Sequence, residues 1–217
     1  MNPYDDELAA VWRDPMEYDM QTHGPSYLPV TAAQRVEVRE FAQKRAAFYD
    51  VVDTRPGAGY YPLSGLLALL RAAYMLHQTA HWQTHGGHFY GDHIMLQRIY
   101  DESLEGIDGV AERLVGLSNS PGAVCPVKQA KLIHSLVTAF ATESHSYGPE
   151  ALIQRSLTVE SVILKVITLT KEAIEGQGQL TDGLEDLLQG LASKHEEFVY
   201  LLQQRSSTRT ASSYDRR

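Results

Sequence analysis

With 217 residues, 43% of them hydrophobic, and a formal net charge of −8, the chain can form one domain with extensions, and its acidity argues against attraction of nucleic acid to the whole surface. No apolar run approaches the roughly 20 residues that are needed to cross a bilayer, and residues 1–10 lack a secretory signal pattern. The single cysteine, Cys125, excludes an intrachain disulfide and a cysteine-based zinc site. From the cysteine count we expect a protein of the reducing cytoplasm, and from the apolar runs we expect no membrane contact.

The N-terminal part of the chain, residues 1–60, is predicted to be an extension of the main domain. Prolines and scattered aromatic residues predict an irregular arm over residues 1–29. A helix is then expected to begin near Thr31, which can serve as its N-cap, and to end at the loop signal of residues 56–59. The sequence assigns no role to this extension.

Four long helices, with a shorter one between the second and third, are predicted in residues 61–205. The expected ranges run from Pro62 to the Gly86–Gly87 break, from Phe89 to the break at Ser118, from about Val127 to Thr142, from about Glu150 to Ala173, and from Thr181 or Asp182 to about Arg205. The run from Val159 to Leu169 is rich in β-branched residues, which would suit a strand. Its length and the spacing of its apolar residues favour a buried helix instead.

These elements form two helical hairpins joined by a long crossover that carries the short helix. This order is typical of an all-α, ferritin-like four-helix bundle, which we assign to residues 61–205, followed by a flexible polar and basic tail over residues 206–217. Ferritin-like bundles often hold a di-iron centre built from Glu-x-x-His motifs on two helices. No glutamate in this sequence has a histidine three residues later, so such a centre within one chain is not expected.

Side chains with metal-binding chemistry lie along the first hairpin. His81 and His93 stand on either side of Gly86–Gly87, so an antiparallel hairpin can turn them toward each other. Asp108 and Glu112 are four residues apart in the second helix and therefore share a face. On a helical wheel these polar groups flank the apolar stripe, as a subunit interface requires.

The spacing of these groups excludes a metal site within one chain. His93 and Asp108 are separated by 15 positions, which is roughly 22 Å along a helix at ~1.5 Å per residue. They could meet only across a two-fold axis, with two histidines from one chain and two carboxylates from the other. Mixed imidazole and carboxylate ligands suit ferrous iron, with zinc as a competitor.

The residues of this hairpin resemble a known family. The stretch His81-Trp82-x3-Gly86-x2-Phe89-x3-His93, followed by Asp108-x2-Ala111-Glu112-Arg113-Leu114, is similar to the Dps (DNA-binding protein from starved cells) miniferritins. The last helix, with Asp186-Leu187-Leu188 and Leu201-Leu202, resembles theirs as well, and the similarity spans roughly residues 63–205. The resemblance implies a hollow dodecamer built of twofold dimers. It also implies a ferroxidase that oxidises ferrous iron preferentially with hydrogen peroxide and stores the ferric mineral. Such a protein would protect against oxidative stress.

The same resemblance implies roles for individual residues. His81 and His93 would be catalytic iron ligands from one subunit, and Asp108 and Glu112 would be ligands from the other. Trp82 would pack beside the site and could quench radicals.

One position departs from the family's pattern. The family usually has an aspartate four residues after the second histidine, where this sequence has Gln97, a neutral and weaker ligand for a hard cation. Iron affinity is therefore expected to fall. Asp101, one turn further on, could compensate only if the helix shifted, and Asp92 is a closer alternative near the turn. His85 and His88 are expected to be exposed turn residues or else secondary metal ligands.

Two further histidines have a commoner reading. A histidine on an apolar helix face is usually a hydrogen-bonded core residue, which is the role we expect for His195 and for His77. His77 lies one turn before His81, however, and a supporting position beside the metal ligands is the other possibility for it.

Three functions compete on the sequence alone. The leading one is the iron-oxidising miniferritin, and the alternative is a Dps-like shell, impaired at Gln97, that acts as a structural or a protein- or DNA-binding particle. The third is DNA compaction through the C-terminal arginines, which are more often a solubilising tail, and we predict such binding to be weak. These arginines are Arg205, Arg209, Arg216 and Arg217.

Overall fold

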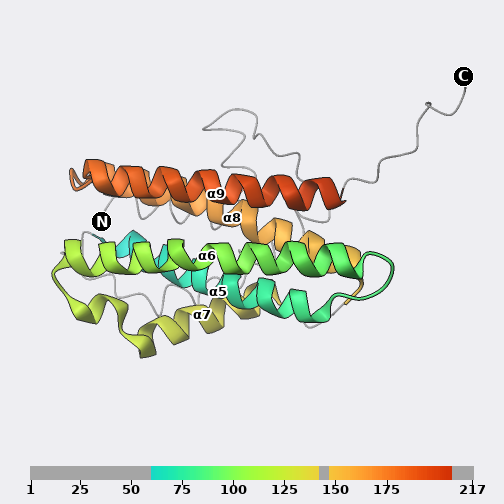
Figure 1. Cartoon of the computed structure of the whole chain (residues 1–217). Helices are drawn as coiled ribbons and strands as arrows, with labels where there is room; N and C mark the ends of the chain where they lie inside the picture. Colours follow the sequence, from blue (N-terminus) through green and yellow to red (C-terminus); the bar gives the residue numbers. More distant parts are fainter. Residues whose placement is uncertain (1–59, 142–146, 207–217) are drawn as a thin grey trace, which may run out of the picture.

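The computed structural model describes residues 60–141 and 147–206, and in these ranges every regular element is helical (Figure 1). The predicted N-terminal arm, its helix from Thr31, and arginines Arg209, Arg216 and Arg217 lie outside the described residues. The predictions made for them therefore remain predictions.

Five α-helices and a short 3₁₀-helix make up the described chain. They are α5 (Tyr61–Gln83), α6 (Phe89–Ser118), η1 (Pro121–Val124), α7 (Pro126–Phe140), α8 (Pro149–Gly176) and α9 (Asp182–Ser206). The four long helices and the shorter α7 confirm the sequence prediction to within a few residues at each end. The β-branched run Val159–Leu169 lies inside α8 as expected, whereas η1 was not predicted.

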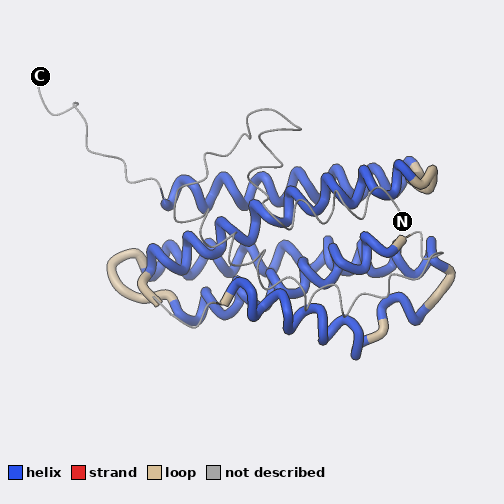
Figure 2. Tube along the Cα trace, turned by 180° about the vertical axis from the view of Figure 1, so that it is seen from behind, coloured by secondary structure: helices blue, strands red, loops and turns tan. Residues whose placement is uncertain are grey.

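The helices form a four-helix bundle with α7 on its outside. Helices α5 and α6 make one antiparallel hairpin and α8 and α9 make the other, while α7 packs against α5 (Figure 1). Seen from behind in Figure 2, the α5–α6 and α8–α9 turns lie at opposite ends of the bundle. Because α7 brings the chain back along the bundle, α8 runs parallel to α6, which confirms the predicted all-α, ferritin-like arrangement with one long crossover.

Local sequence signals set the helix ends. Proline occupies the first turn of α5, α7 and α8, where its missing N–H costs nothing. Gly86, in the turn between α5 and α6, has a φ of +81°, a left-handed conformation that favours glycine. Thr181 begins α9 because its Oγ1 accepts the N–H of Leu184 at 3.3 Å, as the predicted N-cap requires.

Helix α5 lies at the centre of the core. All five residues from 66 to 70 are buried, which means that α5 is covered all round by α6, α7 and α8. Helix α6 approaches α9 closely through small residues, since a Cβ on Gly106 would lie 2.6 Å from Leu191 Cδ1. The opposite face of α6, which points away from the bundle, is exposed to solvent.

A buried carboxylate joins three of the four bundle helices. Glu160 of α8 is fully buried, and its Oε1 accepts a hydrogen bond from His77 Nε2 of α5 at 2.7 Å. Its Oε2 lies 2.5 Å from Nδ1 of His195 on α9, and Ser156 Oγ lies 3.2 Å from the second nitrogen of His77. The expectation of hydrogen-bonded core histidines is thus confirmed for His77 and His195.

The charge of Glu160 depends on these histidines. Burial alone would raise the pKa of the Glu160 carboxyl, but the charges and hydrogen bonds of His195 and His77 outweigh burial and lower its pKa from 4.5 to about 2. Glu160 is therefore an anion in the core at neutral pH, held there by two imidazoles.

We predict that Glu160→Leu lowers the free energy of unfolding by about 3–5 kcal/mol, because it leaves two buried imidazoles without their shared partner. Denaturant unfolding at matched protein concentration measures this loss. The control is Glu196→Leu on the exposed side of α9, which should change stability little. Equal losses in the two variants would contradict a structural role for the buried cluster.

A second prediction concerns acid. Because the folded pKa of Glu160 is lower than its unfolded value, its contribution is complete above about pH 4.5 and is lost as the pH falls toward about 2. Between these values the wild type should lose stability more steeply than Glu160→Gln, which has no proton to gain. Parallel stability curves for the two proteins over this range would show the assignment to be wrong.

Candidate metal site

His81 and His93 meet at the end of the first hairpin. His81 lies in the last turn of α5 and is 8% exposed, and His93 lies in the second turn of α6 and is partly exposed. Their rings stack with centroids 3.7 Å apart and planes inclined by 22°. The structure therefore brings these two predicted ligands together, as the hairpin geometry suggested.

Reciprocal hydrogen bonds set the orientation of both rings. His81 Nδ1 lies 2.8 Å from the carbonyl oxygen of His93, and His93 Nδ1 lies 3.1 Å from the carbonyl oxygen of His81. A carbonyl oxygen can only accept, so each Nδ1 must carry the proton. Each neutral imidazole then keeps the lone pair on Nε2, which is the atom available to a metal ion.

Aromatic rings contact the histidine pair on both sides. Phe89 lies against His93 with centroids 5.0 Å apart, and Tyr100 meets His81 edge-on at 5.4 Å. Burial, with Asp101 and Tyr74 nearby, raises the pKa of Tyr100, so its phenol stays protonated at neutral pH. The histidine pair is thus held between rings and cannot turn freely.

The two predicted carboxylate ligands lie far from this pair. Asp108 and Glu112 are exposed on α6, which is one continuous helix from Phe89 to Ser118. Along that helix Asp108 lies roughly 22 Å from His93, at ~1.5 Å per residue, and Glu112 lies one turn further away. Within the described part of the chain, neither carboxylate makes an ion pair or hydrogen bond.

The remaining candidates on this surface are accessible. Gln97 is partly exposed one turn after His93, and Asp101 is exposed one turn further on. Trp82 follows His81 directly and is 67% exposed, so most of its surface is open to solvent in a single chain. His85 and His88 are exposed turn residues, the first of the two roles expected for them.

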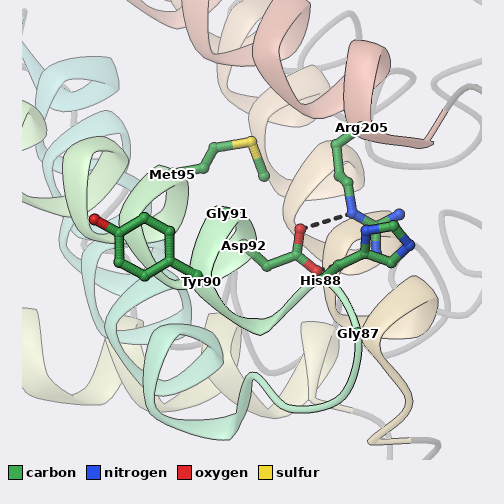
Figure 3. A pocket seen from close by; sticks show the side chains of 7 residues that line it. All are labelled: Gly87, His88, Tyr90, Gly91, Asp92, Met95 and Arg205. Carbon is green, nitrogen blue, oxygen red and sulfur yellow. Dashed lines mark hydrogen bonds and ion pairs between the residues drawn. The ribbon is translucent and has the colours of Figure 1, made fainter.

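Asp92 and Arg205 have a different role from the one expected. The Asp92 carboxylate is buried, and its two oxygens accept hydrogen bonds from Nε and one terminal nitrogen of Arg205 at 2.6 and 3.0 Å (Figure 3). This pair lines a surface pocket of about 370 Å³ next to Met95 and Tyr90. Because each charge already has its partner, we withdraw Asp92 as a metal ligand and Arg205 as a DNA contact. Helix α9 also extends to Ser206, so Arg205 belongs to the bundle.

The core histidines are separate from the surface pair. The His77 ring hydrogen-bonds to Glu160 and Ser156, and no hydrogen bond or ring contact joins it to His81 or His93 in the described residues. In residues 60–141 and 147–206 of one chain, no group of three or more His, Cys, Asp or Glu is arranged to hold a metal ion.

Sequence reasoning missed two residues, Glu160 in the core and Thr84 beside the histidine pair. Glu160 gave no signal because its partners are 35 and 83 positions away. Thr84, next to the histidine pair, looks like any loop residue in the sequence, although it is only 7% exposed.

In the part of the chain that the structure describes, no helix has both the length and the apolar character for crossing a bilayer.

Comparisons with known proteins bear on the family and the fold of the chain. A search of family models found no match. The chain is 30% identical over 144 residues to the "DNA protection during starvation protein" of Porphyromonas gingivalis, an overlap that covers 64% of this chain and 83% of that protein.

Three solved structures share the fold. Dps from Thermosynechococcus elongatus matches with a TM-score of 0.57 at 18% identity, covering 76% of this chain and 95% of that one. DpsC from Streptomyces coelicolor has a TM-score of 0.57 at 22% identity, covering 69% and 84%. An archaeal Dps homologue from Halobacterium salinarum gives 0.57 at 16%, covering 89% and 98%. Together with the bundle and its first hairpin, the identity to the curated relative over most of that protein's length shows that this chain belongs to the Dps family of miniferritins.

Proposed function

We propose that this protein oxidises ferrous iron, with hydrogen peroxide as the preferred oxidant, at sites shared between two subunits, and stores the ferric product. Membership of the Dps family supports the proposal. The observation that carries it is the reciprocal pairing of His81 and His93, two stacked rings whose Nδ1 atoms are both held by carbonyl oxygens, so that each ring keeps its lone pair on Nε2. Ferrous iron is the substrate of these sites, and zinc is its competitor for imidazole ligands.

The outer face of α6 supports a second copy as the source of the carboxylates. At about 100° per residue, Asp108 and Glu112 fall on the same side of α6 as the exposed apolar residues. These apolar residues are Phe89, Tyr90, Ile94 and Leu104. Apolar side chains around unpaired carboxylates are typical of a surface that is covered in an assembly.

A two-fold axis completes the ligand set. With two α6 helices antiparallel across the axis, the carboxylates of Asp108 and Glu112 in one subunit approach His81 and His93 of the other. Each dimer then has two equivalent sites. The dodecamer of such dimers, with the mineral inside it, is the assembly that the family resemblance implies, and we include it in the proposal.

The ligands suit the proposed chemistry. Two ferrous ions give one electron each to hydrogen peroxide, which takes up two protons and becomes two molecules of water. The O–O bond breaks with both electrons supplied together, so no hydroxyl radical is released. Carboxylates stabilise the ferric product because they are anionic oxygen ligands, whereas the neutral imidazoles keep ferrous iron bound beforehand.

We expect any binding of DNA to be weak. The net charge of −8 repels the phosphate backbone, and Arg205 is neutralised by Asp92. Of the four C-terminal arginines, Arg209, Arg216 and Arg217 remain the proposed contacts.

The first test of function is the peroxide-dependent oxidation of ferrous iron, followed by the rise in ferric absorbance. His81→Ala/His93→Ala should slow it at least about tenfold, because the first ligands to the ferrous ion are lost. The matched control is His134→Ala on the exposed side of α7, which should oxidise iron like the wild type. A wild-type rate no higher than the protein-free background would contradict the proposed activity.

A mixing experiment tests whether the sites are shared. A chain without the histidines and a chain with Asp108→Asn/Glu112→Gln are each expected to be inactive. Co-expressed, they form mixed dimers in which one of the two sites has all four ligands, so random pairing restores about a quarter of the wild-type sites. No recovery in mixed assemblies would show that the four residues do not act across an interface.

The departure at Gln97 leads to another prediction. Gln97→Asp adds a charged oxygen ligand one turn after His93 and should tighten ferrous-iron binding about tenfold. The apparent KM for ferrous iron measures this change. Gln97→Asn has the same shape as the aspartate without its charge, and it should leave the KM close to that of the wild type. A KM unchanged in Gln97→Asp would exclude position 97 from the iron site.

A further inference from the structure

Thr84 lies directly behind the histidine pair. It is the first residue after α5, where its backbone leaves the helix with φ −59° and ψ 139°. Its side chain is 7% exposed, which makes it one of the few buried residues of the turn region. A buried hydroxyl needs hydrogen-bond partners, and the partners of Thr84 are parts of the two candidate ligands.

The directions of the Thr84 hydrogen bonds follow from the chemistry of the groups. Thr84 Oγ1 lies 2.8 Å from the carbonyl oxygen of His81, which can only accept, so the hydroxyl proton points to that oxygen. Thr84 Oγ1 also lies 3.3 Å from His93 Nδ1 and presents a lone pair to it. His93 Nδ1 therefore faces two acceptors, the Thr84 hydroxyl and the His81 carbonyl.

The end of α5 contributes electrostatically as well. The His81 carbonyl belongs to the last turn of α5, where carbonyl groups have no partner in the helix and carry the negative end of its dipole. Thr84 satisfies this carbonyl and keeps it directed at His93. The partial negative charge of this carbonyl lies next to the Nδ1–H group of His93. It makes the other ring nitrogen, Nε2, a better electron donor to a metal ion.

We infer that Thr84 is a positioning residue for the metal site: its hydroxyl, together with the His81 carbonyl, fixes the His93 ring with the proton on Nδ1 and the lone pair of Nε2 free for a metal ion. Thr84 itself touches no metal. The inference rests on the proposed function only in taking His81 and His93 as ligands.

The test compares Thr84→Val, which keeps the branched shape and loses the hydroxyl, with Thr84→Ser, which keeps the hydroxyl. Two-bond ¹H–¹⁵N correlation spectra of the metal-free assembly report which ring nitrogen of His93 carries the proton. Calorimetric titration with Zn²⁺ alone reports affinity, and the His81→Ala/His93→Ala protein supplies the background from other histidines. Thermal unfolding reports whether each variant is folded.

The expected result is a His93 ring protonated at Nδ1 in the wild type and in Thr84→Ser, with a mixture of the two tautomers in Thr84→Val. Zn²⁺ affinity should fall about tenfold in Thr84→Val and stay within about twofold of the wild type in Thr84→Ser. A Thr84→Val protein with wild-type spectra and affinity overturns the inference. Equal losses in the two variants also overturn it, because the shape of the residue would then matter and not its hydroxyl.

This test is separate from the test of iron oxidation, since it uses neither iron nor peroxide. A wild type that fails to oxidise iron would end the proposed function and leave the comparison of tautomers and Zn²⁺ affinities intact. A wild type that oxidises iron, with no difference between Thr84→Val and Thr84→Ser in either measurement, would end this inference alone.

Discussion

The buried carboxylate of Glu160 constrains three of the four bundle helices, α5, α8 and α9. Transferring a carboxylate from water into a protein core costs several kcal/mol unless charged or hydrogen-bonding partners offset it. Here the partners come from two other helices, His77 of α5 and His195 of α9, so the rotation of each helix about its axis is set by one ionised group. The rotation of α5 in turn decides where His81 lies, because His81 follows His77 by one helical turn.

The continuity of α6 is the second constraint, and it concerns function. One unbroken helix carries His93 near its beginning and Asp108 in its second half, so no bending of the chain can bring them to one metal ion. In the proposed function a single subunit therefore supplies two half-sites, one of imidazoles and one of carboxylates. The interior of the bundle, where ferritin-like proteins often bind iron, is occupied in this chain by apolar side chains and the Glu160 cluster.

Hydrogen-bond partners separate residues that look equivalent in the sequence. His77, His81, His93 and His195 all lie on helices, yet two of them bind a buried carboxylate and two bind each other's backbone. The second pair keeps a free nitrogen on each ring, which is the property that a ligand needs. Asp92 is similar in sequence to a ligand, but its two oxygens are taken by Arg205.

The sequence by itself determined the helices, their order, the crossover and the separation of His93 from Asp108. These depend on periodicity, on turn residues and on the rise of a helix, all of which are local. Only the tertiary structure decided which carboxylate the core histidines share, which aspartate pairs with Arg205, and where Thr84 lies relative to the histidine pair. Those outcomes depend on pairs such as His77–Glu160 and Arg205–Asp92, which are 83 and 113 positions apart. The pairing of groups so distant in the chain follows from how the helices pack, and no local pattern encodes it.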